Sequence, residues 1–393
     1  MQITNITQST RGGIRELAAD VLYERENATE RLHIRYPDTN APNPCPADSF
    51  FVNQVLVAMA LGENLYMDAP VSADIYNAVM ANTVPLMRSW HPRLHEPDHQ
   101  IELTDPAPQS SNTCCALFSC GVDSWQTLVT HNEQIDSLIH IRGFEMPEKN
   151  EALWDAAHQA VRRVAANFEK NVIPVSTNIL EDTLPHIKEY PGVAWQDFGV
   201  DVWFGHMLCA IGLALRPRAD KLLIPSSYSE GMERVASHPK VEPTLSTATI
   251  QFAITGFEFN RIQKLDIIIR TYPSFVDNFR VCVSKDFIAQ GTTLNCGLCV
   301  KCIRTQAELH ICGCKDFAHL FAESVPVAKL RYIAPRGSRK IWEDAASEAQ
   351  RRGLPKTAAS INIMLSQSTK MRRIRMFFLR LRSQIPALRP DWY

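Results

Sequence analysis

The pattern of hydrophobic and polar positions changes near residue 113. Before it, LHIRY (32–36) predicts a strand, and FFVNQVLVAMALGENL (50–65) predicts a helix that ends at Gly62. Residues 73–90 predict a second helical stretch, and the turn-rich TDPAPQSSN (104–112) indicates a boundary. We therefore expect an N-terminal α+β module over residues 1–108.

From Thr113 onward, short apolar strands alternate with helices. The pattern predicts strands at 113–119, 137–145, 171–177 and 220–227, separated by helices at 123–134, 152–169 and 199–215. Strands with such helical crossovers pair in parallel, with helices on both faces. The predicted fold class is α/β, a doubly wound parallel sheet over residues 109–320, followed by a C-terminal helical extension over 321–393.

Ligands of such sheets bind at the carboxyl ends of the strands, so the loop after the first of them is the foremost candidate site. It reads FSCGVDS (118–124) and leads into a helix. A tight turn at Gly121 brings backbone N–H groups toward an anion, and the hydroxyls of Ser119 and Ser124 add donors at the helix N-terminus. Asp123 is suited to hold a Mg²⁺ that bridges phosphates. The chain contains no GxxxxGK[ST] motif, and a turn that only caps the helix remains the alternative.

The loop resembles the SGGxDS signature of the PP-loop ATP pyrophosphatases, with Cys120 where that signature prefers Gly. This superfamily includes GMP synthetase, NAD synthetase, argininosuccinate synthetase, tRNA thiolases and the cyano-deazaguanine synthase of the queuosine pathway. The resemblance implies that ATP and Mg²⁺ bind at Ser119, Cys120, Gly121, Val122, Asp123 and Ser124, with Arg142, Gly143 and Phe144 near the adenine.

Cysteines form a second candidate site. The chain has 11 of them and no apolar signal-peptide segment at its start, which predicts a cytoplasmic protein with a metal site rather than disulfides. Cys296, Cys299 and Cys302 have CxxCxxC spacing, and Cys282 is our choice of fourth ligand over His310, Cys312 and Cys314. The set resembles the zinc site of the cyano-deazaguanine synthase. Four thiolates favour structural Zn²⁺, and an iron–sulfur cluster is the alternative.

A third group of candidates follows the strand at 220–227. The chain from Ser119 to Thr305 resembles bacterial PP-loop proteins related to the cyano-deazaguanine synthase, which share IPSSY, SHP and NCGxCxKCxRT elements. We expect substrate contacts from Ser227, Tyr228, Ser237 and His238, and catalytic roles for Asp123, Ser124, His238 and Arg261. A hydrogen-bonding surface histidine, and a solvated helix face carrying Arg261 and Lys264, are the alternatives.

Together these features predict an enzyme that transfers AMP from ATP to a carboxylate or amide oxygen, releases pyrophosphate, and lets ammonia or an amine displace AMP to give an amide or nitrile. A tRNA thiolase and a non-catalytic nucleotide-binding protein stay open, as does a homodimer. With 41 basic and 42 acidic residues, the formal charge of −1 gives no reason to require nucleic acid. No apolar run is long enough to span a membrane. The basic segment 371–390 is either a lipid- or RNA-binding amphipathic helix or a docked helix.

Overall fold

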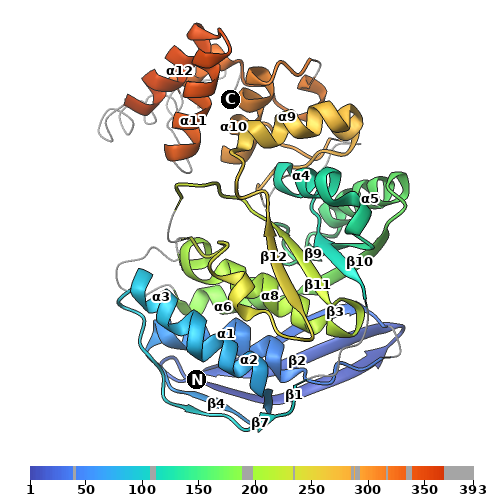
Figure 1. The fold of residues 1–393 in the computed structure, drawn as a ribbon, viewed down its shortest axis with the longest axis vertical. Helices are drawn as coiled ribbons and strands as arrows, with labels where there is room; N and C mark the ends of the chain where they lie inside the picture. The colour runs from blue at the N-terminus through green and yellow to red at the C-terminus, as the bar shows by residue number, and fades with distance from the viewer. Residues whose placement is uncertain are drawn as a thin grey trace, which may run out of the picture.

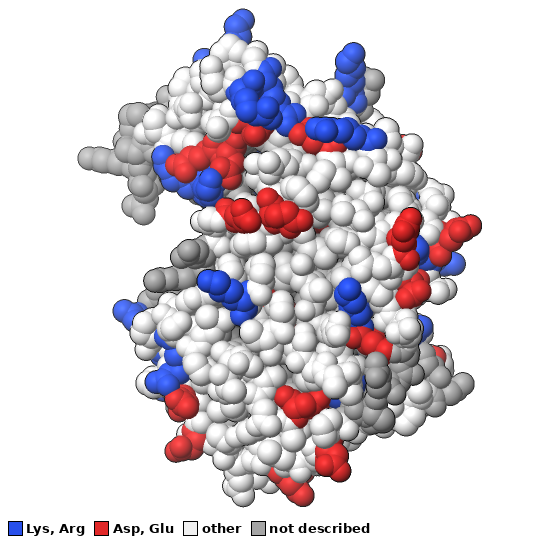
Figure 2. Space-filling model, in the orientation of Figure 1, with Lys and Arg blue, Asp and Glu red and all other residues white. Residues whose placement is uncertain are grey.

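The structure is a computed structural model that describes residues 1–38, 41–106, 112–187, 198–232, 235–284, 287, 293–315, 317–332 and 339–366. The basic segment 371–390 and part of the expected boundary at 104–112 lie outside these ranges. Figure 1 shows helices α9 to α12 grouped at the end of the molecule opposite the N-terminal strands. On the face shown in Figure 2, basic and acidic side chains are interspersed, as the formal charge of −1 suggests.

One ten-stranded, mostly parallel sheet organises the molecule, in the order β12-β11-β8-β9-β10-β3-β2-β1-β4-β6. Its strands are β1 (Gln2–Arg11), β2 (Ile14–Tyr23), β3 (Ala28–Pro37), β4 (Leu65–Met67), β6 (His99–Gln100), β8 (Cys114–Leu117), β9 (Ser137–Arg142), β10 (Asn171–Thr177), β11 (Lys221–Pro225) and β12 (Gln251–Thr255). Strands β5 (Val71–Ser72) and β7 (Leu103–Thr104) pair separately. Because β3 pairs antiparallel with β10, the N-terminal strands continue the sheet of the central region.

The five strands from β12 to β10 are parallel, as predicted for β8, β9, β10 and β11. Along the chain, the strands first proceed from β8 to β9 and β10, and then resume on the other side of β8 with β11 and β12. The strand order therefore reverses between β8 and β11. In an open α/β sheet this reversal opens a crevice at the carboxyl ends of the two strands.

Helices cover both faces of this parallel part. Cys115 and Leu117 of β8 belong to the core that includes α1 and α8, whereas Cys114 and Ala116 belong to the core that includes α4, α5 and α9. The helices are α1 (Ala47–Leu61), α2 (Ala73–Ala78), α3 (Val84–Trp90), α4 (Val122–His131), α5 (Glu151–Asn167), α6 (Ile179–Thr183), α8 (Phe204–Ala214), α9 (Arg261–Thr271), α10 (Val300–Ile311), α11 (Arg339–Arg351) and α12 (Pro355–Ser366). Successive residues of β8 are thus buried in the two cores alternately, as expected for a strand of a sheet that is covered on both faces.

Of the strands before β8 only β3 was predicted, and β12 was missed as well. Strand β1 has only two apolar residues, Ile3 and Ile6, and its other side chains are polar and half-buried or exposed, so its sequence shows no clear apolar strand pattern. It is held by antiparallel pairing with β2 over most of its length. By contrast, the predicted end of α1 at Gly62 is confirmed, because Gly62 adopts a left-handed conformation (φ 64°) just after the helix.

The turn after β9 depends on a glycine, and we predict that Gly143→Ala strongly destabilises the fold. Gly143 has φ 106°, and a Cβ on it would lie 1.7 Å from the carbonyl oxygen of Thr177. Gly353→Ala is the matched control, since Gly353 also has a positive φ (73°) but no atom within 4 Å of the new Cβ. Urea unfolding should show a cost of about 1–2 kcal/mol for the control and clearly more for Gly143→Ala. Equal costs would show that the close approach to Thr177 is not a constraint.

Candidate functional site

The loop between β8 and α4 has a tight turn, but its left-handed residue is Cys120 (φ 60°) and not Gly121 (φ −82°). Cys120 thus takes a conformation that glycine adopts more easily, at the position where the PP-loop signature prefers glycine. The Ser124 hydroxyl donates to the Gly121 carbonyl (3.1 Å) and accepts from the Ser119 N–H (3.3 Å). Ser124 therefore shapes the loop, and the less buried Ser119 lines the pocket described below.

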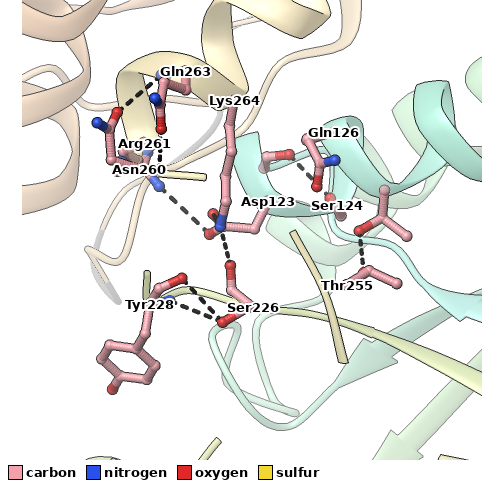
Figure 3. Close-up of polar contacts among 12 residues, drawn as sticks. Asp123, Ser124, Gln126, Ser226, Tyr228, Thr255, Asn260, Arg261, Gln263 and Lys264 are labelled. Carbon is pink, nitrogen blue, oxygen red and sulfur yellow. Dashed lines mark hydrogen bonds and ion pairs between the residues drawn. The ribbon is translucent and has the colours of Figure 1, made fainter. Parts of the chain in front are cut away.

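Asp123, in the first turn of α4, lies at the centre of a charge network (Figure 3). Its carboxylate is 3.0 Å from Nζ of Lys264 and 3.5 Å from Nη1 of Arg261, both on α9. Burial raises the pKa of a carboxyl, but the charges of Lys264 and Arg261 outweigh it and hold the pKa of Asp123 below its ordinary value. Lys264 is 1% exposed and also donates to the Ser226 carbonyl, so α9 does not present a solvated face here.

The network extends from α9 to α10 through Arg261. Its Nε donates to Glu308 (2.8 Å) and its Nη2 to the Thr305 hydroxyl (3.1 Å). Glu308 is fully buried and also lies 3.6 Å from Nε of Arg304. Burial, together with the nearby charge of Arg261, lowers the pKa of Arg304 to about 10. In this part of the network two guanidinium groups, those of Arg261 and Arg304, share the carboxylate of Glu308.

A pocket with a cavity volume of about 130 Å³ lies at the crevice between β8 and β11. Of the predicted site residues it contains Ser119, Gly121, Val122, Asp123, Ser124, Phe144, Ser227 and Arg261. Its apolar lining, called the apolar wall below, is formed by Leu117, Ile139, Ile141, Phe144, Met146, Phe204 and Leu208. Its charged lining, called the charged side below, is formed by Asp123, Glu145, Arg261, Arg280 and Lys301. The pocket is thus suited to a ligand with a flat apolar part and an anionic part.

Sequence reasoning missed Glu145, Arg280 and Lys301. Glu145 follows the predicted Arg142-Gly143-Phe144 segment, and its carboxylate forms ion pairs with Lys301 and, at 3.6 Å, with Arg280. The three side chains come from the turn after β9, the segment after α9 and the first turn of α10, respectively. Lys301 is part of the NCGxCxKCxRT element, but Glu145 and Arg280 belong to no motif identified in the sequence, and only the fold brings the three together.

The other predicted residues lie around the pocket rather than in its lining. Tyr228 lines a smaller neighbouring pocket that shares Ser227 and Arg261 with the first. Arg142 lies 5.8 Å from the ring centroid of Trp154. Burial raises the pKa of the Cys120 thiol to about 12, so this thiol is not a ready nucleophile.

His238 is not brought into the pocket with Asp123. Its ring packs edge-on against Trp90 (5.4 Å between centroids) and Phe257 (4.8 Å), and its Nδ1 accepts from the Lys240 N–H. The His238 N–H donates to Glu242, which is fully buried. Burial raises the pKa of Glu242 to about 7, although bonds from Ser237 and from the His238 N–H oppose the rise. In this structure the loop at 237–242 is a packed, internally bonded segment.

Four cysteines form a compact cluster that could hold a metal such as Zn²⁺. The sulfur atoms of Cys282, Cys296, Cys299 and Cys302 all lie within 4.8 Å of one another. The Sγ distances are 3.9 Å for Cys296–Cys302 and 4.0 Å for Cys299–Cys282. A Zn–S distance of about 2.3 Å places the sulfurs of a tetrahedral site about 3.8 Å apart, so the donor set fits zinc. The choice of Cys282 over His310, Cys312 and Cys314 agrees with this cluster.

The cysteine cluster and the charged side of the pocket share their supports. Asn295 is fully buried, and its amide accepts from the N–H groups of Val281 and Cys282 and donates to the carbonyls of Phe279 and Leu320. Lys301 lies between two of the clustered cysteines, and Arg280 lies two residues before another. The segment that supplies ligands to a metal would therefore also fix two cations of the pocket.

Comparison of the chain with protein-family models, with curated proteins and with solved structures gave no match. Among the described residues, no helix combines the length and the apolar character that a bilayer crossing requires.

We predict that the cysteine cluster binds one metal ion per chain. Cys299→Ser and Cys302→Ser should each remove most of the metal and destabilise the protein, because a closed structural site contributes folding free energy. Cys312→Ser is the matched control, since Cys312 follows the opposite end of the same helix and lies outside the cluster. Elemental analysis measures the content and identifies the ion: zinc supports the structural site, and iron with sulfide supports the alternative. Full metal content in Cys299→Ser would contradict the assignment.

We predict that Glu242 makes the protein less stable at alkaline pH. The pKa of its carboxyl rises from 4.5 in the unfolded chain to about 7 in the folded protein. The folded state therefore binds this proton more tightly, and the stability it contributes is lost as pH rises through this interval. The expected loss is about 3 kcal/mol, and Glu242→Gln should abolish it. Urea unfolding at pH 5 and pH 8 checks this, with the exposed Glu343→Gln as control; equal pH dependence in wild type and Glu242→Gln would contradict it.

Proposed function

We propose that this protein is an ATP-dependent enzyme of the PP-loop type, which adenylates a carboxylate or amide oxygen of its substrate and releases pyrophosphate. The observation that carries the proposal is the pocket at the reversal of strand order, which is lined by a helix N-terminus, Ser119, several cations and a set of apolar side chains. An adenine on the apolar wall, near Phe144, would leave the phosphates on the charged side.

On the phosphate side, the proposal assigns roles to the residues of the Asp123 network. Lys264 and Arg261 contact Asp123 and would contribute positive charge near the phosphates. Asp123 is the carboxylate that would hold the Mg²⁺ of the nucleotide, with Glu145 in the same pocket. Magnesium is commonly bound by one or two carboxylates together with phosphate oxygens, so this donor set fits; the ion would neutralise phosphate charge.

The proposed reaction has two steps. In the first, a substrate oxygen attacks the α-phosphorus, the P–O bond to the β-phosphate breaks, and its electron pair leaves with pyrophosphate. In the second, ammonia or an amine attacks the adenylated carbon, forms a C–N bond and loses a proton, while AMP leaves with the C–O electron pair. From a carboxylate the product is an amide; adenylation of that amide on its oxygen, followed by loss of AMP with the C–O electron pair and of the two N–H protons, would give a nitrile. Among the predicted substrate contacts, Ser227 lines both this pocket and the smaller pocket of Tyr228, so it is the one placed to contact a substrate beside the nucleotide.

The thiolase alternative is less well supported. It needs a reactive cysteine pair near the nucleotide, but Cys114 and Cys115 lie within β8. Burial raises the pKa values of their thiols to about 11 and about 12, which disfavours the thiolate. The proposed role of the cysteine cluster is structural, as Zn²⁺ held by four thiolates has no open position for chemistry.

We predict that the wild-type protein binds ATP with Mg²⁺ and that Asp123→Asn weakens this binding at least about tenfold, because a charged contact is lost. Isothermal titration with and without Mg²⁺ measures the effect, and the magnesium dependence should disappear in the variant. Asp20→Asn is the matched control, since it removes a carboxylate paired with Arg31 on the N-terminal hairpin.

Two outcomes would contradict this proposal. If wild type does not bind ATP at millimolar concentration, the proposed function is wrong. If it binds ATP and Asp123→Asn binds equally well, the nucleotide site has been assigned to the wrong loop. A protein that binds ATP but releases no pyrophosphate with any fraction of a cell extract would favour the non-catalytic alternative.

A further inference from the structure

Arg280 is a buried cation whose hydrogen-bonding capacity is only partly used. Its residue is 2% exposed, and within the described part of the chain neither Nε nor Nη1 has a hydrogen-bond acceptor. Nη2 donates to the Cys282 carbonyl (3.1 Å), and Nη1 lies 3.6 Å from Glu145. The residue lines the charged side of the pocket. Buried donors without acceptors are costly, so their presence at a pocket wall indicates a missing anionic partner.

The surrounding structure fixes Arg280 in place. Its N–H donates to the Cys120 carbonyl (3.0 Å), which ties it to the loop that leads into α4. On its other side, the next two residues donate their N–H groups to Asn295. Arg280 is therefore held between the candidate phosphate loop and the cysteine cluster. A cation positioned in this way is preorganised for an anion near Ser119 and Gly121.

Lys301 and Glu145 complete the group. Lys301 lies in the first turn of α10, is 36% exposed at its side chain, and forms an ion pair with Glu145. Burial raises the pKa of Glu145, but Lys301 and Arg280 outweigh it and hold the pKa below its ordinary value. A single ionised carboxylate thus lies between two cations at the mouth of the pocket. One carboxylate leaves part of the positive charge uncompensated, whereas a pyrophosphoryl group brings more negative charge and more acceptor oxygens.

We propose that Arg280 and Lys301 form a subsite for a pyrophosphoryl anion, and that Glu145 occupies this subsite until the anion displaces it. The inference rests on the proposed function, in which the group bound there is the β,γ-diphosphate of ATP and, after transfer, the pyrophosphate product. Arg280 contributes the planar fork that phosphate oxygens match, and Lys301 contributes a mobile charge at the entrance. Glu145 acts as an internal competitor that weakens anion binding in the resting protein.

The competing role for Glu145 is that of a cation ligand, and the two roles predict opposite effects of the same substitution. If Glu145 competes with the anion, Glu145→Gln frees two cations and tightens the binding of pyrophosphate in the absence of divalent ions. If Glu145 is needed to hold an ion that accompanies the phosphates, the substitution brings no gain without that ion. The sign of the effect therefore decides between them.

The experiment titrates the full-length, metal-loaded protein with inorganic pyrophosphate in buffer without divalent cations. Arg280→Gln should weaken binding at least about tenfold, and Lys301→Met should weaken it several-fold, because each removes a charged contact. Glu145→Gln should strengthen binding several-fold. Arg352→Gln and Glu16→Gln are the controls: each removes a charge with its own partner, Asp266 on α9 or Arg35 on β3, and should change binding less than twofold.

Each outcome has one reading. Unchanged pyrophosphate binding in Arg280→Gln and Lys301→Met, with full metal content, would overturn the subsite, and so would weaker or unchanged binding in Glu145→Gln. Should Arg280→Gln fail to fold, Lys301→Met and Glu145→Gln still decide, since both residues are partly exposed at the pocket mouth. If wild type binds pyrophosphate but not ATP, the proposed function fails while the subsite stands. If wild type binds ATP and no variant changes pyrophosphate binding, the subsite is wrong while the proposed function stands.

Discussion

The ion pairs of Asp123 with Lys264 and Arg261 are the interaction on which the candidate site depends. Asp123 starts α4, the two cations start α9, and Arg261 continues to Glu308 on α10. One carboxylate thus connects the loop after β8 to two helices that are distant in sequence. Because these groups are largely buried, breaking one pair leaves an uncompensated charge in a poorly solvated place, which is strongly destabilising. The positions of α4, α9 and α10 relative to one another therefore depend on these ion pairs.

The cysteine cluster supports this arrangement from the opposite side. It joins the segment after α9 to the start of α10, and Gly297 allows the connecting turn, since a Cβ there would lie 1.8 Å from the Glu323 carbonyl oxygen. The same turn brings Asn295 to the backbone of residues 279–282, with which its amide forms three hydrogen bonds, and a fourth joins it to the Leu320 carbonyl. A metal at this cluster would help to hold the two cations of the pocket lining, Arg280 and Lys301, in position.

Local patterns predicted the parts of the molecule that local physics determines. The alternation of apolar strands and helices gave the parallel part of the sheet, Gly62 gave the end of α1, and CxxCxxC spacing gave three cysteines of the cluster. Strand β1 escaped because it has few apolar residues and depends on pairing with β2. Strand β2 was missed although Leu17, Val21 and Tyr23 are buried in the core. Arg280, Lys301 and Glu145 escaped because only the tertiary fold brings them together. His238 was expected in the pocket, but packing against Trp90 and Phe257 holds it in another environment.

The balance of charge around the pocket constrains what can bind there. Arg261, Lys264, Arg280, Lys301 and Arg304 surround only three carboxylates, those of Asp123, Glu145 and Glu308. A protein with a formal charge of −1 has no general excess of cations, so this local surplus is a property of the site. Clustering like charges in a partly desolvated pocket is unfavourable unless a ligand compensates it. A neutral or cationic ligand would leave that energetic cost in place, whereas a polyphosphate would remove it. This asymmetry is the physical basis for the proposal that the pocket binds a phosphorylated ligand.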